Sequence, residues 1–184
     1  MNILPTVARL LLAATLVSGL LPTTASAADR AALERDARAA LQKLTNTVPA
    51  AKSLSSSATA VLVFPKVTKA GLGVGGQYGD GVLFRQGKVA GYYNTSGASF
   101  GLQAGAQQFG YAMFMMNDKA LSALSANEGF EVGVGPSVVV MDEGKAQTMT
   151  TTTAKDDIYA FIFGQKGLMA GVGIQGNKIT RLKE

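Results

Sequence analysis

The sequence contains no cysteine, no histidine and no tryptophan. Without cysteine, the chain can form no disulfide and offers no thiol nucleophile or attachment point for a thioether-linked lipid. Without cysteine and histidine, it lacks the usual ligands of zinc and other transition metals, and histidine is also the commonest general base. We therefore expect a non-catalytic protein with no metal site and no cofactor.

Charged residues are also few, and they are slightly unbalanced. The chain has 17 Lys and Arg residues against 12 Asp and Glu residues. A modest basic excess suits an anionic surface, but it is too small to indicate a nucleic-acid partner.

The first residues have the pattern of a secretory signal peptide. Arg9 and the free amino terminus precede an apolar run from Leu10 to Leu21, and Ala25-Ser26-Ala27 is a small-residue cleavage site. The run is shorter than the roughly 20 residues that a membrane-spanning helix needs. We expect cleavage after Ala27, which leaves residues 28–184 as one domain, periplasmic or peripherally associated with a membrane.

Residues 29–48 predict the clearest helix, with Asp29 as its N-cap and Pro49 as its stop. Apolar side chains recur there at spacings of three and four: Leu33, Ala37, Ala40, Leu41, Leu44 and Val48. Several arginines lie on the polar side. The helix therefore has two interpretations: it packs on the domain, which we favour, or it lies on a membrane surface.

Most of the remaining chain predicts strands and turns. A Ser-rich stretch, 53–57, leads into a strand at 60–64, and Gln86-Gly87-Lys88 predicts a hairpin between 81–85 and 89–93. A short helix is predicted between Asn117 and Asn127. Further expected elements are a turn at 142–145, a loop or edge strand at 148–153, a hairpin joining 158–163 to 168–175, and a last strand at 179–182.

Residues 71–81 read GLGVGGQYGDG and fit the dinucleotide pattern G-x-G-x-x-G. That pattern requires a helix to begin at the glycines, but here further glycines follow at once. The period is two instead, as in a strand: Leu72, Val74 and Tyr78 share one face. The other face holds Gln77 and five of the glycines: Gly71, Gly73, Gly75, Gly79 and Gly81. The same alternation is found at 100–107, 131–135 and 170–175.

Several predicted strands thus carry mostly glycine on one face. Because glycine weakens a strand interior, its repeated use there requires a structural explanation. Glycine permits tight coiling of a sheet and close approach of another backbone. We expect a helix or loop against the glycine side, with a groove for an acyl chain as the alternative. The predicted fold is one α+β domain: an N-terminal amphipathic helix and a curved, mostly antiparallel sheet or partial barrel with one or two short helices.

Two patterns resemble catalytic motifs. Residues 97–101 match G-x-S-x-G, with Ser99 at the nucleophile position, but the chain has no histidine to activate it. A Ser–Lys pair is the remaining hydrolase hypothesis, which we do not favour. Asp142-Glu143 and Asp156-Asp157 are adjacent carboxylates, which point to opposite faces of a strand and do not converge.

Basic residues gather near the expected turns and the end of the chain. If they converge, they form a patch for phosphate head groups; otherwise they are a scatter of solvated charges. The candidates for head-group binding are Lys66, Lys69, Arg85, Lys88, Lys178 and Arg181.

Several ordered motifs resemble the SYLF domain, found in bacterial envelope proteins and in eukaryotic cortical-actin and endocytic proteins. They are Phe64–Gly71, Gly91–Thr95 continuing into Ala98–Gly105, Val132–Pro136 and Gln165–Leu168, and the resemblance extends from about residue 30 to the end. It implies lipid binding, especially of phosphoinositides in eukaryotic members, and actin binding in the yeast ones. It also associates the N-terminal helix and basic residues with membrane contact.

An exported protein meets neither phosphoinositides nor actin, so the resemblance implies a bacterial anionic phospholipid as the partner here. The leading hypothesis is a periplasmic lipid-binding module. The alternative is a structural or protein-interaction component of the cell envelope, which would bind protein partners through a sheet edge.

Overall fold

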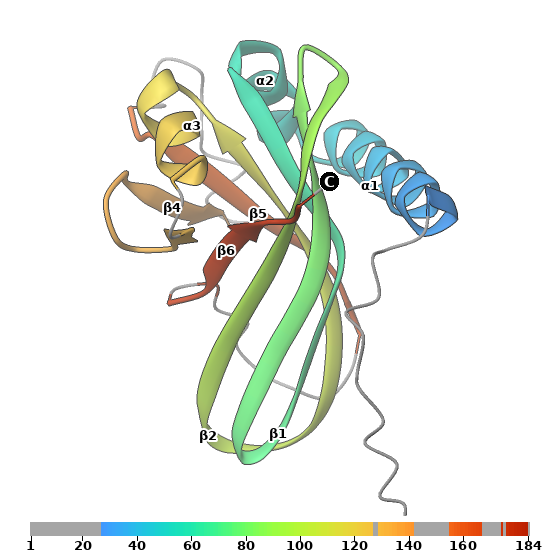
Figure 1. The fold of residues 1–184 in the computed structure, drawn as a ribbon, viewed down its shortest axis with the longest axis vertical. Helices are drawn as coiled ribbons and strands as arrows, with labels where there is room; N and C mark the ends of the chain where they lie inside the picture. Colours follow the sequence, from blue (N-terminus) through green and yellow to red (C-terminus); the bar gives the residue numbers. More distant parts are fainter. Residues whose placement is uncertain (1–26, 127–128, 142–154, 167–173, 175, 184) are drawn as a thin grey trace, which may run out of the picture.

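The computed structural model describes residues 27–126, 129–141, 155–166, 174 and 176–183, without the side chains of 73, 99–104, 165 and 166. The fold is α+β, as predicted (Figure 1). Its elements are α1 (Ala27–Thr47), α2 (Pro49–Ser57), β1 (Ala60–Arg85), β2 (Lys88–Met115), α3 (Asp118–Leu124), β3 (Phe130–Glu131), β4 (Val138–Met141), β5 (Ile158–Lys166) and β6 (Lys178–Arg181).

The helical region divides at Pro49. The predicted first helix is confirmed and ends at Thr47, as the proline requires. Asp29 is not the N-cap that the sequence predicted, because Ala27 and Ala28 are already helical and Asp29 lies within the first turn. Pro49 then occupies the start of α2, where its missing N–H would have no partner in any case. The Ser-rich stretch belongs to α2, a helix that the sequence pattern did not predict.

The strands β1 and β2 form one long antiparallel ribbon, paired from Ala60 and Met115 to Arg85 and Lys88. The predicted hairpin is confirmed: Gln86 and Gly87 both have positive φ, 51° and 74°, which matches the twist of the flanking strands. The separate strands expected at 60–64 and 71–81 are parts of β1. Pro65 does not interrupt it, because the register shifts between Phe64 and Val67 and this bulge accommodates the proline.

The ribbon folds over, so that the second half of β1 crosses its own first half (Figure 1). A Cβ added to Gly79 would lie 2.7 Å from the carbonyl oxygen of Lys66, and one added to Gly81 would lie 2.7 Å from that of Val63. The glycine face of β1 therefore points inward. The backbone packed against it is β1 itself, and neither the expected helix or loop nor an acyl-chain groove lies at these two positions.

The strands form a mixed, mostly antiparallel sheet in the order β3-β6-β2-β5-β4, with β1 also paired to β2. Among the strands that the structure describes, only β4 and β5 pair in parallel. This arrangement confirms the predicted curved, mostly antiparallel sheet.

Apolar side chains pack on both faces of this sheet. Helices α1 and α2 cover one face, through Ala37, Leu44 and Leu54 packed with Phe114 and Phe161 of the strands. On the other face the folded ribbon and α3 enclose a second cluster, which includes Leu62, Phe64, Tyr111, Met113 and Leu124.

Helix α1 is held on the ribbon by its arginines as well as by its apolar side. The Arg30 guanidinium lies 5.0 Å from the centre of the Tyr92 ring, and that of Arg38 lies 4.7 Å from the centre of the Phe84 ring. Arg38 also donates a hydrogen bond to the carbonyl of Gly87 at 3.0 Å. The packed-helix interpretation is confirmed, and these two arginines are engaged with the domain.

The shorter predicted elements had mixed outcomes. The helix after Asn117 and the last strand are confirmed as α3 and β6. A strand over 131–135 is wrong, because β3 stops at Glu131 and the φ angles of 103° and 92° at Gly133 and Gly135 belong to turns. The sequence also predicted a turn that begins at Gly164. This prediction is wrong for residues 164–166, because they belong to β5, which ends at Lys166.

Several other expectations lie outside the described residues. These are the turn at 142–145, the segment 148–153 and most of the second hairpin arm at 168–175. Among the helices that are described, none has the length and apolar character needed to cross a bilayer.

Candidate functional site

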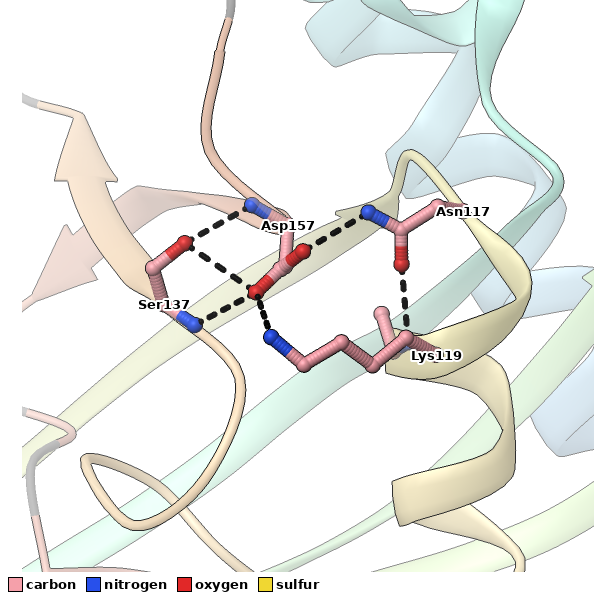
Figure 2. A network of polar contacts seen from close by, with 5 residues as sticks. Asn117, Lys119, Ser137 and Asp157 are labelled. Atoms are coloured by element: carbon pink, nitrogen blue, oxygen red, sulfur yellow. Dashed lines mark hydrogen bonds and ion pairs between the residues drawn. The ribbon is translucent and has the colours of Figure 1, made fainter.

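Asp157 is the centre of the polar network shown in Figure 2. Its carboxylate accepts hydrogen bonds from the Asn117 side chain at 2.7 Å, the Ser137 amide at 2.9 Å and the Lys119 ammonium at 3.0 Å. These hydrogen bonds, that from Asn117 above all, hold the pKa of the Asp157 carboxyl well below its usual range. The network joins the start of α3 to the segments before β4 and β5, so its role is structural.

The neighbouring carboxylate faces elsewhere. Asp156 accepts a hydrogen bond from the Tyr159 hydroxyl at 3.3 Å, and its own amide donates to that hydroxyl oxygen at 2.9 Å. The prediction that Asp156 and Asp157 do not converge is confirmed. Within the part of the chain that the structure describes, no group of three or more His, Cys, Asp or Glu residues could hold a metal ion.

Ser99 lies inside β2, where it pairs with Gly75 of β1. A nucleophile elbow requires a sharp turn from a strand into a helix, which lifts the serine out of the sheet. The backbone here is a continuous strand. The geometry therefore does not support the hydrolase hypothesis.

The inside of the folded ribbon carries buried polar side chains. Gln77, Gln107 and Asn177 are 6%, 2% and 2% exposed, and Lys69 is 5% exposed. Gln77 donates to the Asn177 side chain, yet Gln77 Oε1, Gln107 Oε1 and Asn177 Nδ2 have no hydrogen-bond partner among the described residues. Buried amides of this kind are normally satisfied by protein or by ordered water. The sequence placed the glutamines on the glycine face and predicted that a helix or loop covers it, but did not predict that β1 itself encloses them.

A buried hydroxyl pair lies next to these amides. Tyr111 donates a hydrogen bond to the Thr95 hydroxyl at 2.7 Å, and burial raises the pKa of Tyr111 far above its ordinary value. The phenol therefore stays neutral in the folded protein at any physiological pH and acts as a fixed hydrogen-bond donor.

The six candidate basic residues fall into separate groups. Arg85 and Lys88 are exposed and directly opposite each other beside the Gln86-Gly87 turn. Lys178 and Arg181 are exposed on β6, which pairs with residues 93–96 of β2. Lys66 is exposed at the bulge of β1, whereas Lys69 is buried.

The structure does not bring all six side chains together. Ser96, the partner of Lys178, is separated from Lys88 by about 26 Å of strand at roughly 3.3 Å per residue. The basic groups are therefore distributed along the ribbon. Lys66 also lines a groove of about 580 Å³ between α1 and β1, together with Asp36 and Asp80.

Among the described residues, three of the four exposed large hydrophobic side chains lie on the other face of β1. Leu72 is 82% exposed, Val74 63% and Tyr78 58%. These three residues share the apolar face of the alternation seen in the sequence, and the inward glycine face leaves them outside. The alternation defined this face but could not show that it is in contact with solvent.

A comparison with known families gives one match, in the second half of the chain. Residues 96–184 match the family model described as Ysc84, Las17-binding protein actin regulator. This segment, just under half of the chain, is a SYLF-family segment. A comparison with curated proteins gives no significant match.

The SYLF family comprises lipid- and actin-binding domains rather than enzymes. The matched segment starts in the middle of β2, so α1, α2 and β1 precede it. Because β1 pairs with β2 along almost its whole length, these preceding elements and the matched segment form one folded unit.

Proposed function

We propose that this protein is a non-catalytic, exported lipid-binding module that contacts the head groups of anionic phospholipids at a periplasmic membrane surface. The proposed contacts are the exposed basic residues Lys66, Arg85, Lys88, Lys178 and Arg181. Lys69 is excluded because only 5% of it is exposed. We do not propose actin as the partner, because the sequence predicts an exported protein, and such a protein and cytoskeletal actin occupy different compartments.

The observation that carries this proposal is the unpaired state of these five side chains. Within the part of the chain that the structure describes, none of the five takes part in an ion pair, whereas Arg35 pairs with Asp36 and Lys119 with Asp157. The charges of the five residues are therefore available to an external anion. In addition, Asp80 is the only acidic residue between Ala60 and Met115, so the ribbon repels phosphate at few positions.

Co-sedimentation of residues 28–184 with vesicles tests the proposal. We expect binding to vesicles that contain phosphatidylglycerol, weak binding to pure phosphatidylcholine, and a loss of binding as salt is raised, because salt screens exposed charges. Equally weak binding to both vesicle types would contradict the proposal and favour the alternative, a protein-interaction component of the envelope.

A pair of matched double variants tests the residues. Arg85→Glu with Lys88→Glu removes two basic contacts at the hairpin, each of which contributes about 1 kcal/mol near an anionic surface, so we expect binding to weaken by at least roughly 30-fold. Lys52→Glu with Lys155→Glu makes the same change in net charge at exposed residues outside the proposed contacts. Equal losses in both double variants would mean that net charge, and not this hairpin, determines binding.

Export has its own test. Expression of the full chain in a Gram-negative host, followed by periplasmic fractionation and N-terminal sequencing, is expected to give a protein that begins at Ala28. Retention of the full-length chain in the cytoplasm would contradict the assigned location.

A further inference from the structure

The folded end of the β1–β2 ribbon projects from the rest of the molecule. Figure 1 shows the two strands turning over together at the end opposite α2 and the Gln86-Gly87 turn. The register shifts between Leu72 and Val74, and the backbones of Gly71 and Gly75 come into direct contact. A side chain at Gly71 would overlap the Gly75 backbone, so the sequence is adapted to a sharp fold at this point.

The fold places apolar side chains at the outermost part of the ribbon. Leu72 is 82% exposed and Val74 63%, higher fractions than for any other large hydrophobic residue among those described. The strand has period two, and the glycine face is taken up by contacts of β1 with itself. Leu72 and Val74 therefore cannot turn inward without exposing the glycine face instead.

The ribbon end also lacks charge of either sign. From Ala70 to Gly79 in β1, and from Val89 to Met115 in β2, the sequence contains no Asp, Glu, Lys or Arg. Soluble surfaces normally intersperse charges among their apolar groups, and an exposed apolar region without them marks a contact site.

Basic residues lie on either side of this uncharged end. Lys66 precedes it on β1, and Lys178 lies beside Ser96 of β2; both are exposed. An apolar end followed by lysines corresponds to the order of layers in an anionic bilayer, with hydrocarbon first and phosphate groups above it. A protein partner of stable affinity would require a contact of about 800 Å² on each side, anchored by aromatic or arginine side chains. The narrow end of a two-stranded ribbon, whose described side chains expose the aliphatic Leu72 and Val74, fits the bilayer better than such a broad protein contact.

We propose that the folded end of the β1–β2 ribbon inserts Leu72 and Val74 into the hydrocarbon of an anionic membrane, while Lys66 and Lys178 stay at the level of the head groups. This inference rests on the proposed lipid-binding function. It adds an apolar insertion site to the electrostatic contacts and predicts how the molecule is oriented on the bilayer.

The absence of cysteine makes this orientation directly measurable. Single variants Leu72→Cys and Val74→Cys can be labelled with an environment-sensitive nitrobenzoxadiazole dye without background labelling. Val134→Cys is the matched control, because Val134 is also an exposed apolar residue, 61%, but lies in the turn after β3. With phosphatidylglycerol vesicles, we expect a blue shift and a several-fold rise in emission at 72 and 74, quenching by nitroxide-labelled acyl chains, and no response at 134.

Binding measurements with Leu72→Asp, Val74→Asp and the control Val134→Asp complete the test. Because each substitution removes an apolar side chain from the membrane, we expect roughly tenfold weaker binding for each of the first two and no change for the control. The side chains are exposed, so folding is expected to be retained, which thermal melting of the variants will check.

Three results would overturn the inference. If wild type binds anionic vesicles while the labels at 72 and 134 respond alike, or while Leu72→Asp binds normally, insertion is refuted and the electrostatic function stands. If the emission rises with protein concentration and without vesicles, the ribbon end contacts a second copy of the chain. If wild type binds no anionic vesicles at all, the proposed function and this inference both fail.

Discussion

The close contact between the two halves of β1 makes a sharp prediction for Gly81. Replacement by alanine adds a Cβ that would lie 2.5 Å from Cδ1 of Phe64 and 2.7 Å from the carbonyl oxygen of Val63. Phe64 is completely buried, and its ring lies 4.7 Å from that of Tyr111. The phenylalanine therefore cannot move aside freely, and the two strand segments must separate.

The size of the effect follows from two opposing terms. Overpacking of a well-packed core costs typically about 1–3 kcal/mol. Alanine in place of glycine in a strand interior recovers only about 0.5–1 kcal/mol. Since the contacts include backbone, we take the upper part of the first range and expect Gly81→Ala to lower the free energy of unfolding by about 2 kcal/mol. For a domain of this size, that corresponds to a fall in Tm of roughly 4–8 °C.

Urea denaturation followed by circular dichroism measures this change, and Gly76→Ala is its control. The nearest atom to a Cβ at Gly76 is the Gly97 carbonyl oxygen at 3.8 Å, an ordinary contact, so we expect a change within about 0.5 kcal/mol. Equal urea midpoints for the two alanine variants would refute the idea that the ribbon folds back on its glycine face.

Three further predictions concern contacts that hold the elements together. Arg38→Ala removes a hydrogen bond and a ring contact, so we expect a loss of about 1 kcal/mol in urea denaturation, against almost none for Arg35→Ala in an exposed ion pair. Tyr111→Phe removes the hydrogen bond to Thr95, and thermal melting is expected to show a loss of about 1 kcal/mol. Asp157→Asn is expected to destabilise the protein at pH 7. Because the pKa of Asp157 in the folded protein lies below the unfolded value near 4, the stability difference from wild type is present above about pH 4 and shrinks as the pH falls further. Denaturation of both proteins between pH 7 and pH 2 measures this difference. A constant difference over that range would contradict the assigned role of Asp157.

Elements with strong local signals were predicted correctly from the sequence. The helix after Asn117 forms because the Asn117 side chain accepts a hydrogen bond from the Ala120 amide at 3.0 Å and so caps the first turn. The turn at Gln86-Gly87 follows from the tolerance of glycine for positive φ. In both places, residues adjacent in sequence supply the interaction that determines the structure.

Predictions that depended on interrupting an element were less successful. The strand predicted at 60–64 was expected to end before Pro65, but a bulge accommodates this proline and β1 continues. The Ser-rich stretch is helical because Leu54 anchors α2 in the core, and the hydroxyls of Ser56 and Ser57 bond to the Ser53 carbonyl within this helix. The strand predicted at 131–135 fails for the opposite reason: glycines there serve as turn residues with positive φ rather than as the bare side of a strand.

For the candidate site too, the sequence predicted some features and not others. The sequence identified the basic residues and the uncharged stretches, since charge is a property of composition. It did not distinguish buried Lys69 from exposed Lys66, or show that Leu72 and Val74 would project into solvent.

The sequence by itself determined that this chain alternates between a bare and an apolar face, and that neither face of the ribbon end carries charge. Only the tertiary structure decided what packs against the glycine face. A strand with glycines on one side indicates a covered face but does not identify the segment that covers it, and here that segment is a part of β1 that is distant in sequence. Two strand segments can cross at such short range only where glycine supplies no side chain, so the glycine face is buried and the apolar face remains outside.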